Sequence, residues 1–375
     1  MLLEWSSPQN SKRFYETKKL RRSKNFIVTH LEIENDVNLA PFTTLKIGGK
    51  ARYFARALYD DHVVEAVRFV ADRNIRLFIL GGGSNVLISD EGFDGLALQI
   101  AIPGIVREEP INTDKVGLTA GAGEDWDQFV EYCVDHDLAG VECLSGIPGL
   151  IGGTPIQNVG AYGQDVAETI VSVRCFDRET QRFVVLDHSE CGFAYRSSIF
   201  NSIERDRYIV LSVTFALKPG GLAKIAYKDL AERFGDRKPS LEEVRKVVLS
   251  IRRSKSMVID ALDVDSRSAG SFFKNPIVSR EKLSEINEAN GAVAPSFDAG
   301  SDAVKIPAAW LIENAGFNKG FMLGRAGISS KHTLALINRG NAAAAEIVEL
   351  KDKIQFAVNK KFGITLQPEP VFVGF

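Results

Sequence analysis

The chain has 375 residues, 45% of them hydrophobic, with 46 basic and 48 acidic side chains and a formal net charge of -2. This length is typical of two or three domains of about 100–200 residues, each with a buried core. Because the two signs nearly cancel, the composition gives no global reason to expect binding to nucleic acid or to a membrane surface, and partners must be sought at local sites.

No segment predicts insertion into a membrane or secretion. The apolar runs fall short of the roughly 18 residues that a membrane span requires, and the N-terminus lacks the apolar core of a secretory signal. Cys133, Cys143, Cys175 and Cys191 lack C-x-x-C spacing, and the five histidines form no H-x-x-x-H pair. We therefore expect buried reduced thiols, no metal site and a cytoplasmic location.

Residues 1–25 carry seven basic side chains and two acidic ones, with little hydrophobic periodicity. Such a segment has too little apolar surface to bury, so we expect a solvated arm outside the folded domains. A charge run of this kind is usually a tail, although it could also contact an anionic partner.

Residues 26–219 are expected to form a first domain with two α/β lobes, at about 26–95 and 96–219. Alternation of apolar residues predicts strands, and helical spacing predicts helices. In the first lobe these are a strand at 51–55, a helix at 61–73 and a strand at 77–80.

The second lobe begins with a predicted strand at 116–120. A helix is expected from Asp125 to Gly140, with an apolar face formed by Trp126, Phe129, Val130 and Cys133. An antiparallel or mixed sheet is then completed by strand-like runs at 170–176, 183–186 and 208–215.

Lys218-Pro219-Gly220-Gly221 joins a rigid proline to flexible glycines, so we expect a linker there and a second domain at 220–375. A helix is predicted at 240–253, where Ser240 and Glu243 have capping-box spacing. Another is predicted at 342–361, with Gly363 beyond its end. Its apolar face consists of Ile347, Leu350, Ile354 and Val358.

Gly81-Gly82-Gly83-Ser84-Asn85 lies between two predicted strands, which does not fit the strand-turn-helix context of a dinucleotide-binding fingerprint. G-x-G-x-x-G is missing here and at Gly121-Ala122-Gly123, and no G-x-x-x-x-G-K-[ST] occurs. Successive N–H groups of such a turn can still cradle a phosphate, and a simple tight turn is the alternative.

The segment 145–163 holds six glycines among apolar and amide residues. Its backbone can approach a large flat ligand, and Thr154, Gln157 and Asn158 can form hydrogen bonds to it. Because a purely structural loop would not need three clustered polar side chains, we predict a ligand-binding loop.

Gly270-Ser271-Phe272-Phe273-Lys274-Asn275-Pro276 places a hydroxyl and an amide among small, apolar and turn-forming residues. Glycine permits positive φ or close approach to a ligand, and Asn-Pro ends regular structure, so Ser271 would be held rigidly. A tight turn between two strands is the alternative.

Together with Phe193-x-Tyr195-Arg196-x-Ser198-x-Phe200 and Pro368-Glu369-Pro370, these segments resemble the UDP-N-acetylenolpyruvoylglucosamine reductase (MurB) family, from about Asn38 to the C-terminus. The resemblance implies an α+β protein with the FAD-binding fold of the vanillyl-alcohol oxidase type and a UDP-sugar-binding domain. It implies non-covalent FAD, NADPH as co-substrate, and reduction of UDP-N-acetylglucosamine enolpyruvate to UDP-N-acetylmuramate in peptidoglycan synthesis. NADPH would reduce the flavin first, and flavin N5 would then give hydride to the enol ether.

The resemblance also implies three catalytic residues. Ser271 would be the proton donor, and Arg196 and Glu369 would stabilise the enolate-like intermediate. A serine is a poor acid in water and works only when it is held against a strongly basic carbon. Taken singly, Arg196 is typical of a surface cation and Glu369 of a strand carboxylate, but the three in matching frames indicate catalysis.

The other site residues follow from the same resemblance. Cofactor contacts would come from Gly81, Gly82, Gly83, Ser84, Asn85, Gly149, Gly153, Thr154, Gln157, Asn158, Gly160, Ala161 and Arg252. Substrate contacts would come from Tyr162, Tyr227, Lys255 and Asn275. The Tyr227 segment resembles the first of the family's two types, in which a loop closes over the UDP. Two departures are Ser256-Met257-Val258 after Lys255 and Val371, where members often carry arginine.

Two other functions share parts of this pattern. A sugar or aldonolactone oxidase of the same flavin fold would use oxygen and often bind its flavin covalently through His or Cys, which neither glycine-rich segment contains. A non-catalytic UDP-sugar-binding protein would lose Ser271, Arg196 or Glu369, and all three are present. We expect a monomeric reductase.

Overall fold

The first sheet contains the β-α-β unit that the sequence predicts. The computed structural model describes residues 30–111 and 113–375, so the predicted arm at 1–25 lies outside the described residues. Residues Leu31–Phe375 form one unit, to which the following description applies. The unit begins with β1 (Ile33–Asn38), β2 (Lys50–Ala57), helix α1 (Asp60–Arg73), β3 (Arg76–Leu80), β4 (Val86–Ile88) and β5 (Phe93–Ile100).

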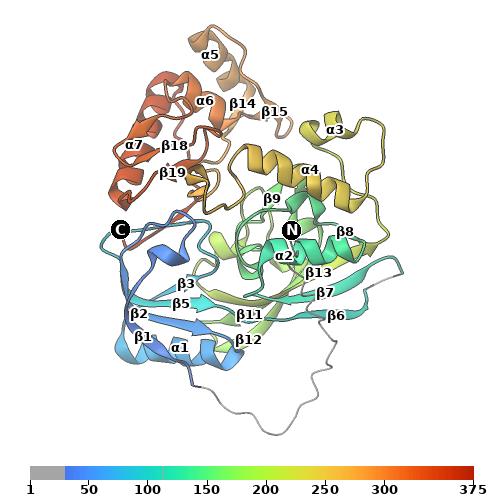
Figure 1. Ribbon diagram of the computed structural model, residues 1–375, viewed down its shortest axis with the longest axis vertical. Helices are drawn as coiled ribbons and strands as arrows, with labels where there is room; N and C mark the ends of the chain where they lie inside the picture. Colours follow the sequence, from blue (N-terminus) through green and yellow to red (C-terminus); the bar gives the residue numbers. More distant parts are fainter. Residues whose placement is uncertain (1–29, 112) are drawn as a thin grey trace, which may run out of the picture. The chain divides into compact units, whose positions relative to one another are not determined.

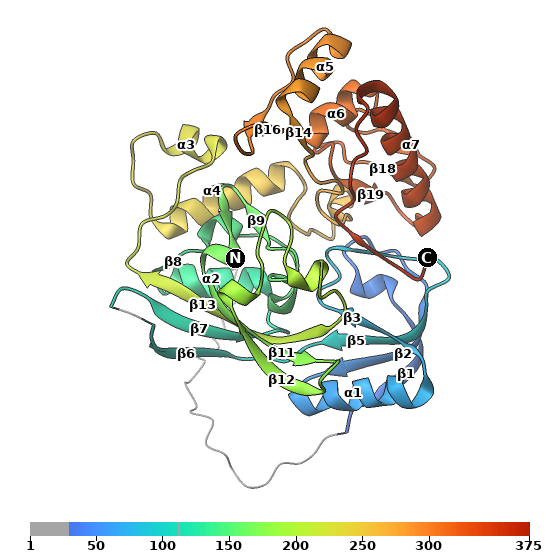
Figure 2. The ribbon, with the colours of Figure 1, turned by 180° about the vertical axis from the view of Figure 1, so that it is seen from behind.

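The sheet order is β1-β2-β5-β3, with β1 antiparallel to β2, and with β5 parallel to both β2 and β3. The expected lobe boundary at 95 falls inside β5, which pairs with this sheet as far as Ile100. Helix α1 ends before Asn74, whose φ of 50° is a conformation that asparagine tolerates at a helix C-terminus. In both views α1 lies at the bottom, under its sheet (Figures 1 and 2).

The second sheet is antiparallel, in the order β12-β11-β13-β7-β6. Its strands are β6 (Ile105–Pro110), β7 (Val116–Gly121), β11 (Ile170–Asp177), β12 (Arg182–Asp187) and β13 (Tyr208–Pro219), with β8 (Leu138–Ala139) beside β13. The strands predicted at 170–176, 183–186 and 208–215 are therefore confirmed as β11, β12 and β13.

Two boundaries differ from the prediction. Helix α2 (Trp126–Asp135) ends five residues before Gly140, because Leu138 and Ala139 instead pair with the end of β13. The same pairing makes Lys218 and Pro219 the last residues of a strand, so that only the two glycines after them remain for the predicted linker.

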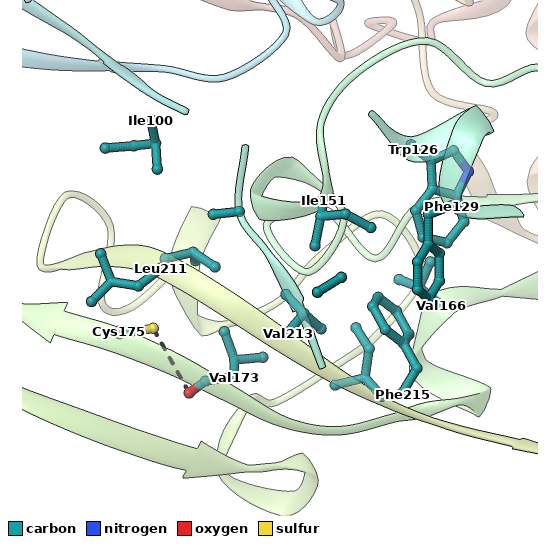
Figure 3. Close-up of a cluster of buried hydrophobic side chains, with 14 of the residues drawn as sticks. Ile100, Trp126, Phe129, Ile151, Val166, Val173, Cys175, Leu211, Val213 and Phe215 are labelled. Carbon is teal, nitrogen blue, oxygen red and sulfur yellow. Dashed lines mark hydrogen bonds between the residues drawn. The ribbon is translucent and has the colours of Figure 1, made fainter. Parts of the chain in front are cut away.

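The largest core extends from α1 and the first sheet to the place where α2 meets the second sheet (Figure 3). Trp126 and Phe129 from α2 pack on Phe215 of β13, with ring centroids 5.9 and 4.9 Å from it. These side chains are almost fully buried, and removing one such ring typically costs about 3–5 kcal/mol. Cys133, Cys143, Cys175 and Cys191 are buried free thiols, as predicted.

Helices α3 (Lys228–Phe234) and α4 (Leu241–Ser254) follow the second sheet. The predicted capping box is present: Ser240 Oγ accepts from the N–H of Glu243 at 3.1 Å, and the Glu243 carboxylate accepts from the N–H of Ser240 at 2.9 Å. Arg245 of α4 donates to both carboxylate oxygens of Asp127 in α2, at 2.6 and 3.0 Å. This bidentate ion pair fixes α4 above the second sheet.

The C-terminal elements gather at the top of both views (Figures 1 and 2). The helices are α5 (Arg280–Asn290), α6 (Ala308–Asn314) and α7 (Ala344–Phe362). Two small sheets contain β14 (Ile277–Ser279), β15 (Phe297–Asp298), β16 (Ala303–Lys305), β17 (Met322–Leu323), β18 (Ala326–Ile328) and β19 (Leu336–Asn338). The predicted face of α7 is buried, and Gly363 ends the helix with a φ of 66°.

A last strand, β20 (Val371–Val373), returns to the first half of the chain. It pairs in parallel with β4, joining Val371 to Val86 and Val373 to Ile88. Residues near 370 are therefore fixed beside the glycine turn that precedes β4. Among the residues that the structure describes, no helix is long and apolar enough to cross a membrane.

Candidate functional site

The two glycine-rich segments lie against each other. A Cβ atom built on Gly82 would stand 2.7 Å from the Cα of Gly149, a contact that real Cβ atoms essentially never make. Ser84 Oγ lies 2.9 Å from the Cβ position of Gly149. At Gly81 and Gly153, by contrast, a built Cβ meets nothing within 4 Å. The loops thus need glycine where they touch, and elsewhere they leave backbone open to a ligand.

Asn85 joins the glycine turn to two other parts of the site. Its Nδ2 donates to Gln157 Oε1 at 2.6 Å and to the carbonyl of Glu369 at 3.3 Å. Its own carbonyl accepts from the N–H of Val371 at 2.9 Å. Val371, one of the two departures, therefore contributes its main chain to the site.

Two of the predicted ligand-binding side chains form hydrogen bonds to the backbone of the protein itself. Thr154 Oγ1 donates to the carbonyl of Ile151 at 2.9 Å. Asn158 Nδ2 donates to the carbonyl of Ala194 at 3.2 Å, and its Oδ1 accepts from the N–H of Ala167 at 3.1 Å. Both side chains are buried and satisfy nearby backbone groups. Their contact with a ligand stays a prediction.

Arg196 and Glu369, far apart in sequence, form an ion pair. Arg196 Nε lies 3.5 Å from Glu369 Oε2, and the two side chains are 23% and 10% exposed. Arg196 Nη2 donates to the carbonyl of Gly160 at 2.7 Å, beside the short strand β9 (Gly160–Ala161), which pairs with β10 (Gln164–Asp165). Nε itself is buried and makes no aligned hydrogen bond within the described residues. The charge of Nε is therefore met by the Glu369 carboxylate without an aligned hydrogen bond.

Three non-glycine residues at this place have left-handed backbone conformations. The φ angles are 47° at Asn158, 50° at Tyr162 and 54° at Arg196. This conformation costs roughly 1–2 kcal/mol at Tyr162 and Arg196, and less at Asn158, because asparagine tolerates it. Such strain persists only where surrounding contacts enforce it, and it is often found at functional sites.

Burial raises the pKa of the Glu369 carboxyl above its ordinary value, against the opposing charges of Arg196 and Lys274. Lys274 Nζ donates to the carbonyl of Arg196 at 3.3 Å. The desolvation of the carboxylate thus outweighs its ion pair, and protonation is easier than in water. Lys274 was not among the predicted site residues, although it stands in the quoted motif.

Ser271 lies on a segment that is hydrogen-bonded to the segment of Glu369. The carbonyl of Phe272 accepts from the N–H of Glu369, and the N–H of Lys274 donates to Gln367, both at 2.9 Å. Phe273 and Pro368 form an isolated bridge between the two segments. Gly270 has a φ of 74°, which is the left-handed conformation expected for it. The predicted catalytic trio is thus gathered on neighbouring segments.

His332 also faces Ser271, although no motif in the sequence predicted this contact. Its Nε2 lies 3.5 Å from Ser271 Oγ. Burial lowers the pKa of His332 to about 4, and the nearby charges of Lys255, Lys319 and Arg252 act in the same direction. The ring is therefore neutral at physiological pH.

The predicted substrate residues Tyr162, Tyr227 and Lys255 lie near one another. The rings of Tyr162 and Tyr227 meet edge to face, with centroids 5.5 Å apart. Tyr227 is the N-cap of α3, and Lys255 follows α4, where its Nζ lies 3.5 Å from Asp229 Oδ2. A hollow between the two helices is lined by Asp229, Glu232, Arg233, Ile251, Ser254 and Lys255.

Arg252 lies beside Tyr162 on the inner side of α4. Its Nη2 donates to the carbonyl of Met257 at 2.7 Å, and its Nε is buried with no partner among the described residues. Ser256 Oγ donates to Asp263 at 2.6 Å. Ser256 and Met257, which differ from the family pattern, therefore stabilise this part of the site. Ser256 fixes the turn after α4, and Met257 binds the Arg252 side chain through its carbonyl.

The side chain of Asn275 forms a hydrogen bond within the protein. Its Oδ1 accepts from the N–H of Ala308 at 2.9 Å, at the start of α6. The amide thereby fixes α6 to the Ser271 segment, and its predicted contact with substrate stays a prediction.

A family model for the C-terminal domain of UDP-N-acetylenolpyruvoylglucosamine reductase matches residues 262–373 of this chain, and a model for an FAD binding domain matches residues 51–185. UDP-N-acetylenolpyruvoylglucosamine reductase of Thermobifida fusca is 47% identical over 350 residues, covering 90% of this chain and 97% of that protein. The chain belongs to the UDP-N-acetylenolpyruvoylglucosamine reductase family. The same-named protein of Streptomyces coelicolor is 45% identical, over 91% of this chain and 90% of the relative.

The fold agrees with this membership. The crystal structure of the MurB protein from Thermus caldophilus has a TM-score of 0.62 and 23% identity, covering 92% of this chain and 99% of that one. The predicted α+β architecture with an FAD-binding fold is confirmed. Family membership favours a reductase over an oxidase of the same fold.

The residues present fit FAD. The open backbone at Gly81 and Gly153 and the unpartnered Nε of buried Arg252 are suited to a flat ring system and to phosphate oxygens, respectively. Of the predicted cofactor residues, Gly82, Ser84 and Asn85 meet Gly149 and Gln157 where the two loops touch.

Changing Gly153 to alanine is expected to weaken FAD binding at least about tenfold, roughly 1.4 kcal/mol, without lowering the stability of the apoprotein. The new methyl group would point into space that is open to a ligand. Gly82→Ala is the matched control: its Cβ would meet the backbone at Gly149, so apoprotein stability should fall by about 1–3 kcal/mol. Flavin titration and denaturation would measure both. Wild-type FAD affinity in Gly153→Ala would contradict this placement.

Proposed function

We propose that the chain reduces the enol ether of UDP-N-acetylglucosamine enolpyruvate to UDP-N-acetylmuramate, with NADPH as reductant. The observation that carries the proposal is the gathering of Ser271, Arg196 and Glu369 on neighbouring segments, in a chain that belongs to the reductase family. When bound, FAD accepts hydride from NADPH and supplies it to the substrate.

Arg196 and Glu369 act on the charge that develops during the reduction. Hydride addition at the methylene carbon of the enol ether moves an electron pair toward the substrate carboxylate. The Arg196 guanidinium is a permanent cation beside Glu369, so it can attract that carboxylate. Glu369, with its raised pKa, can carry a proton and donate it in a hydrogen bond to the same oxygens.

Ser271 supplies the proton that completes the product. Its Oγ–H bond breaks as the new C–H bond forms at the carbon adjacent to the carboxylate, and the serine oxygen then recovers a proton from solvent. Such a transfer requires a fixed hydroxyl because serine is a weak acid. The hydrogen bonds of Phe272 to both neighbouring segments hold it in place.

The other end of the substrate lies near α3 and α4 in this proposal. Tyr162 and Tyr227 contact the nucleotide sugar, Lys255 binds its diphosphate, and Asn275 is near the Ser271 segment. Because Asp229 already neutralises Lys255, substrate binding exchanges that carboxylate for phosphate oxygens. We propose a monomer in the cytoplasm, without nucleic-acid or membrane partners. The buried free thiols agree with a reducing compartment.

The test follows the two half-reactions separately under anaerobic conditions. We expect NADPH to bleach the flavin of the purified holoenzyme, and UDP-N-acetylglucosamine enolpyruvate to restore its absorbance while UDP-N-acetylmuramate forms. A flavin that stays reduced until oxygen enters would instead favour the oxidase. A protein that binds the UDP-sugar without either colour change would favour the non-catalytic alternative.

A further inference from the structure

The turn that carries His332 is fixed to the substrate-binding half of the site by a buried carboxylate. Asp265 is 6% exposed and accepts from the N–H of Ser330 at 2.8 Å and from the hydroxyl of Ser329 at 3.2 Å. Ser329 Oγ in turn accepts from the N–H of His332 at 3.3 Å. A chain of hydrogen bonds therefore leads from Asp265 to the backbone of His332.

The same turn is also fixed to the Ser271 segment. The N–H of Phe272, next to Ser271, donates to the carbonyl of Leu334 at 2.7 Å. Lys331 Nζ, next to His332, donates to Asp263 at 2.9 Å. Because both ends are held, the 3.5 Å contact between His332 Nε2 and Ser271 Oγ is part of the fold and not a chance meeting of two mobile side chains.

The surroundings of the ring decide which atom donates. Burial of the ring and the charges of Lys255, Lys319 and Arg252 all oppose protonation of His332. A ring in such surroundings is a poor general base, since taking the proton of Ser271 would place a fourth cation among three. A neutral imidazole can instead donate from Nε2, leaving Nδ1 without a proton.

We infer that His332 is a positioning residue for Ser271: its Nε2–H donates to Ser271 Oγ and turns the serine proton toward the substrate carbon. A hydroxyl that accepts one hydrogen bond directs its own proton elsewhere, here to the open side of the site. When the proton leaves Oγ, the same N–H stabilises the negative charge on the oxygen. No new bond is made to His332. The inference rests on the proposed function.

The experiment compares His332→Leu, which removes the N–H, with His332→Gln, whose Nε2–H can take the same place. In stopped-flow measurements on the holoenzyme, we expect His332→Leu to slow flavin reoxidation at saturating substrate about 10²-fold, the typical effect of a misplaced reacting group. His332→Gln should recover most of this loss. Reduction by NADPH and the substrate Kd should stay within a factor of about three of wild type.

The solvent deuterium isotope effect on reoxidation should increase in His332→Leu, because proton transfer becomes slower than the other steps. ¹⁵N NMR of the histidines should show the Nε2–H tautomer of His332. His136→Leu, on the outer end of α2, is the matched control and should change neither rate.

Three results would overturn the inference. They are wild-type reoxidation in His332→Leu, a weakened substrate Kd with an unchanged rate at saturation, or an Nδ1–H tautomer. The tautomer is measured on the unsubstituted protein, so it decides even if His332→Leu does not fold. Failure of wild-type enzyme to be reoxidised by substrate would contradict the proposed function itself.

Discussion

Changing Ser271 to alanine is expected to slow reoxidation of the reduced flavin by substrate about 10²–10⁴-fold, the usual contribution of a positioned acid. Reduction by NADPH should keep its wild-type rate, because the hydroxyl is needed only when the substrate carbon takes a proton. The variant should fold normally, since among the described residues the Ser271 hydroxyl makes a single side-chain hydrogen bond, with His332. Anaerobic stopped-flow absorbance would separate the two half-reactions.

Ser268→Ala is the matched control for this experiment. Ser268 lies three residues earlier on the same segment, and its hydroxyl accepts from the N–H of Gly270 at 3.2 Å. The Ser268→Ala substitution should reduce the rate of flavin reoxidation by less than about tenfold, because it shifts the segment without removing the proton donor. Equal losses in the two variants would mean that the geometry of the segment matters and that Ser271 is not the acid.

Changing Glu369 to glutamine is expected to reduce the rate of flavin reoxidation by substrate about 10²–10³-fold while increasing stability at neutral pH. The rate falls because a group that stabilises developing charge is lost. Stability rises because the folded-state pKa of Glu369 is raised from 4.5, so ionisation is costlier in the folded chain than in the unfolded one. The wild type therefore loses stability as pH rises from about 4.5 through the raised pKa, and glutamine has no such loss.

Glu346→Gln, at a distant position, is expected to change stability at neutral pH in the opposite direction. Hydrogen bonds from the N–H groups of Arg325 and Ala343 lower the pKa of Glu346. Its stabilising contribution is present above the unfolded-state pKa and is lost as pH falls through the folded-state pKa. Denaturation between pH 4 and 8 should show Glu346→Gln less stable than wild type at pH 7, with normal turnover. A Glu369→Gln variant that is also less stable at pH 7 would show that the Arg196 ion pair outweighs burial.

Elements set by local chemistry were predictable from the sequence. Ser240 and Glu243 lie three residues apart and satisfy each other's backbone, so the start of α4 needs no distant partner. The end of α2 was not predictable in this way, because the strand after it forms only by pairing with Lys218 and Pro219 of β13. A pattern read along the chain contains no information about such a partner.

The same distinction applies to the site. Arg196, Ser271 and Glu369 were predicted because their segments together resemble one family, and the structure places them on neighbouring segments. His332 belongs to no motif and lies 61 residues after Ser271 in the chain, so its position in the sequence does not predict the contact. Thr154 and Asn158 were predicted from their polarity to contact a ligand, but their side chains satisfy backbone within the fold.

The parallel pairing of β20 with β4 also has a consequence for synthesis on the ribosome, because the two strands emerge at very different times. The glycine turn before β4 emerges early in synthesis, and Arg196 and Ser271 follow, but Glu369 and Val371 arrive nearly 300 residues after Asn85. Domains usually fold as they emerge, so the N-terminal lobes can form while the site still lacks its carboxylate. Nascent chains can thus fold their cofactor-binding half before they can carry out chemistry on a substrate.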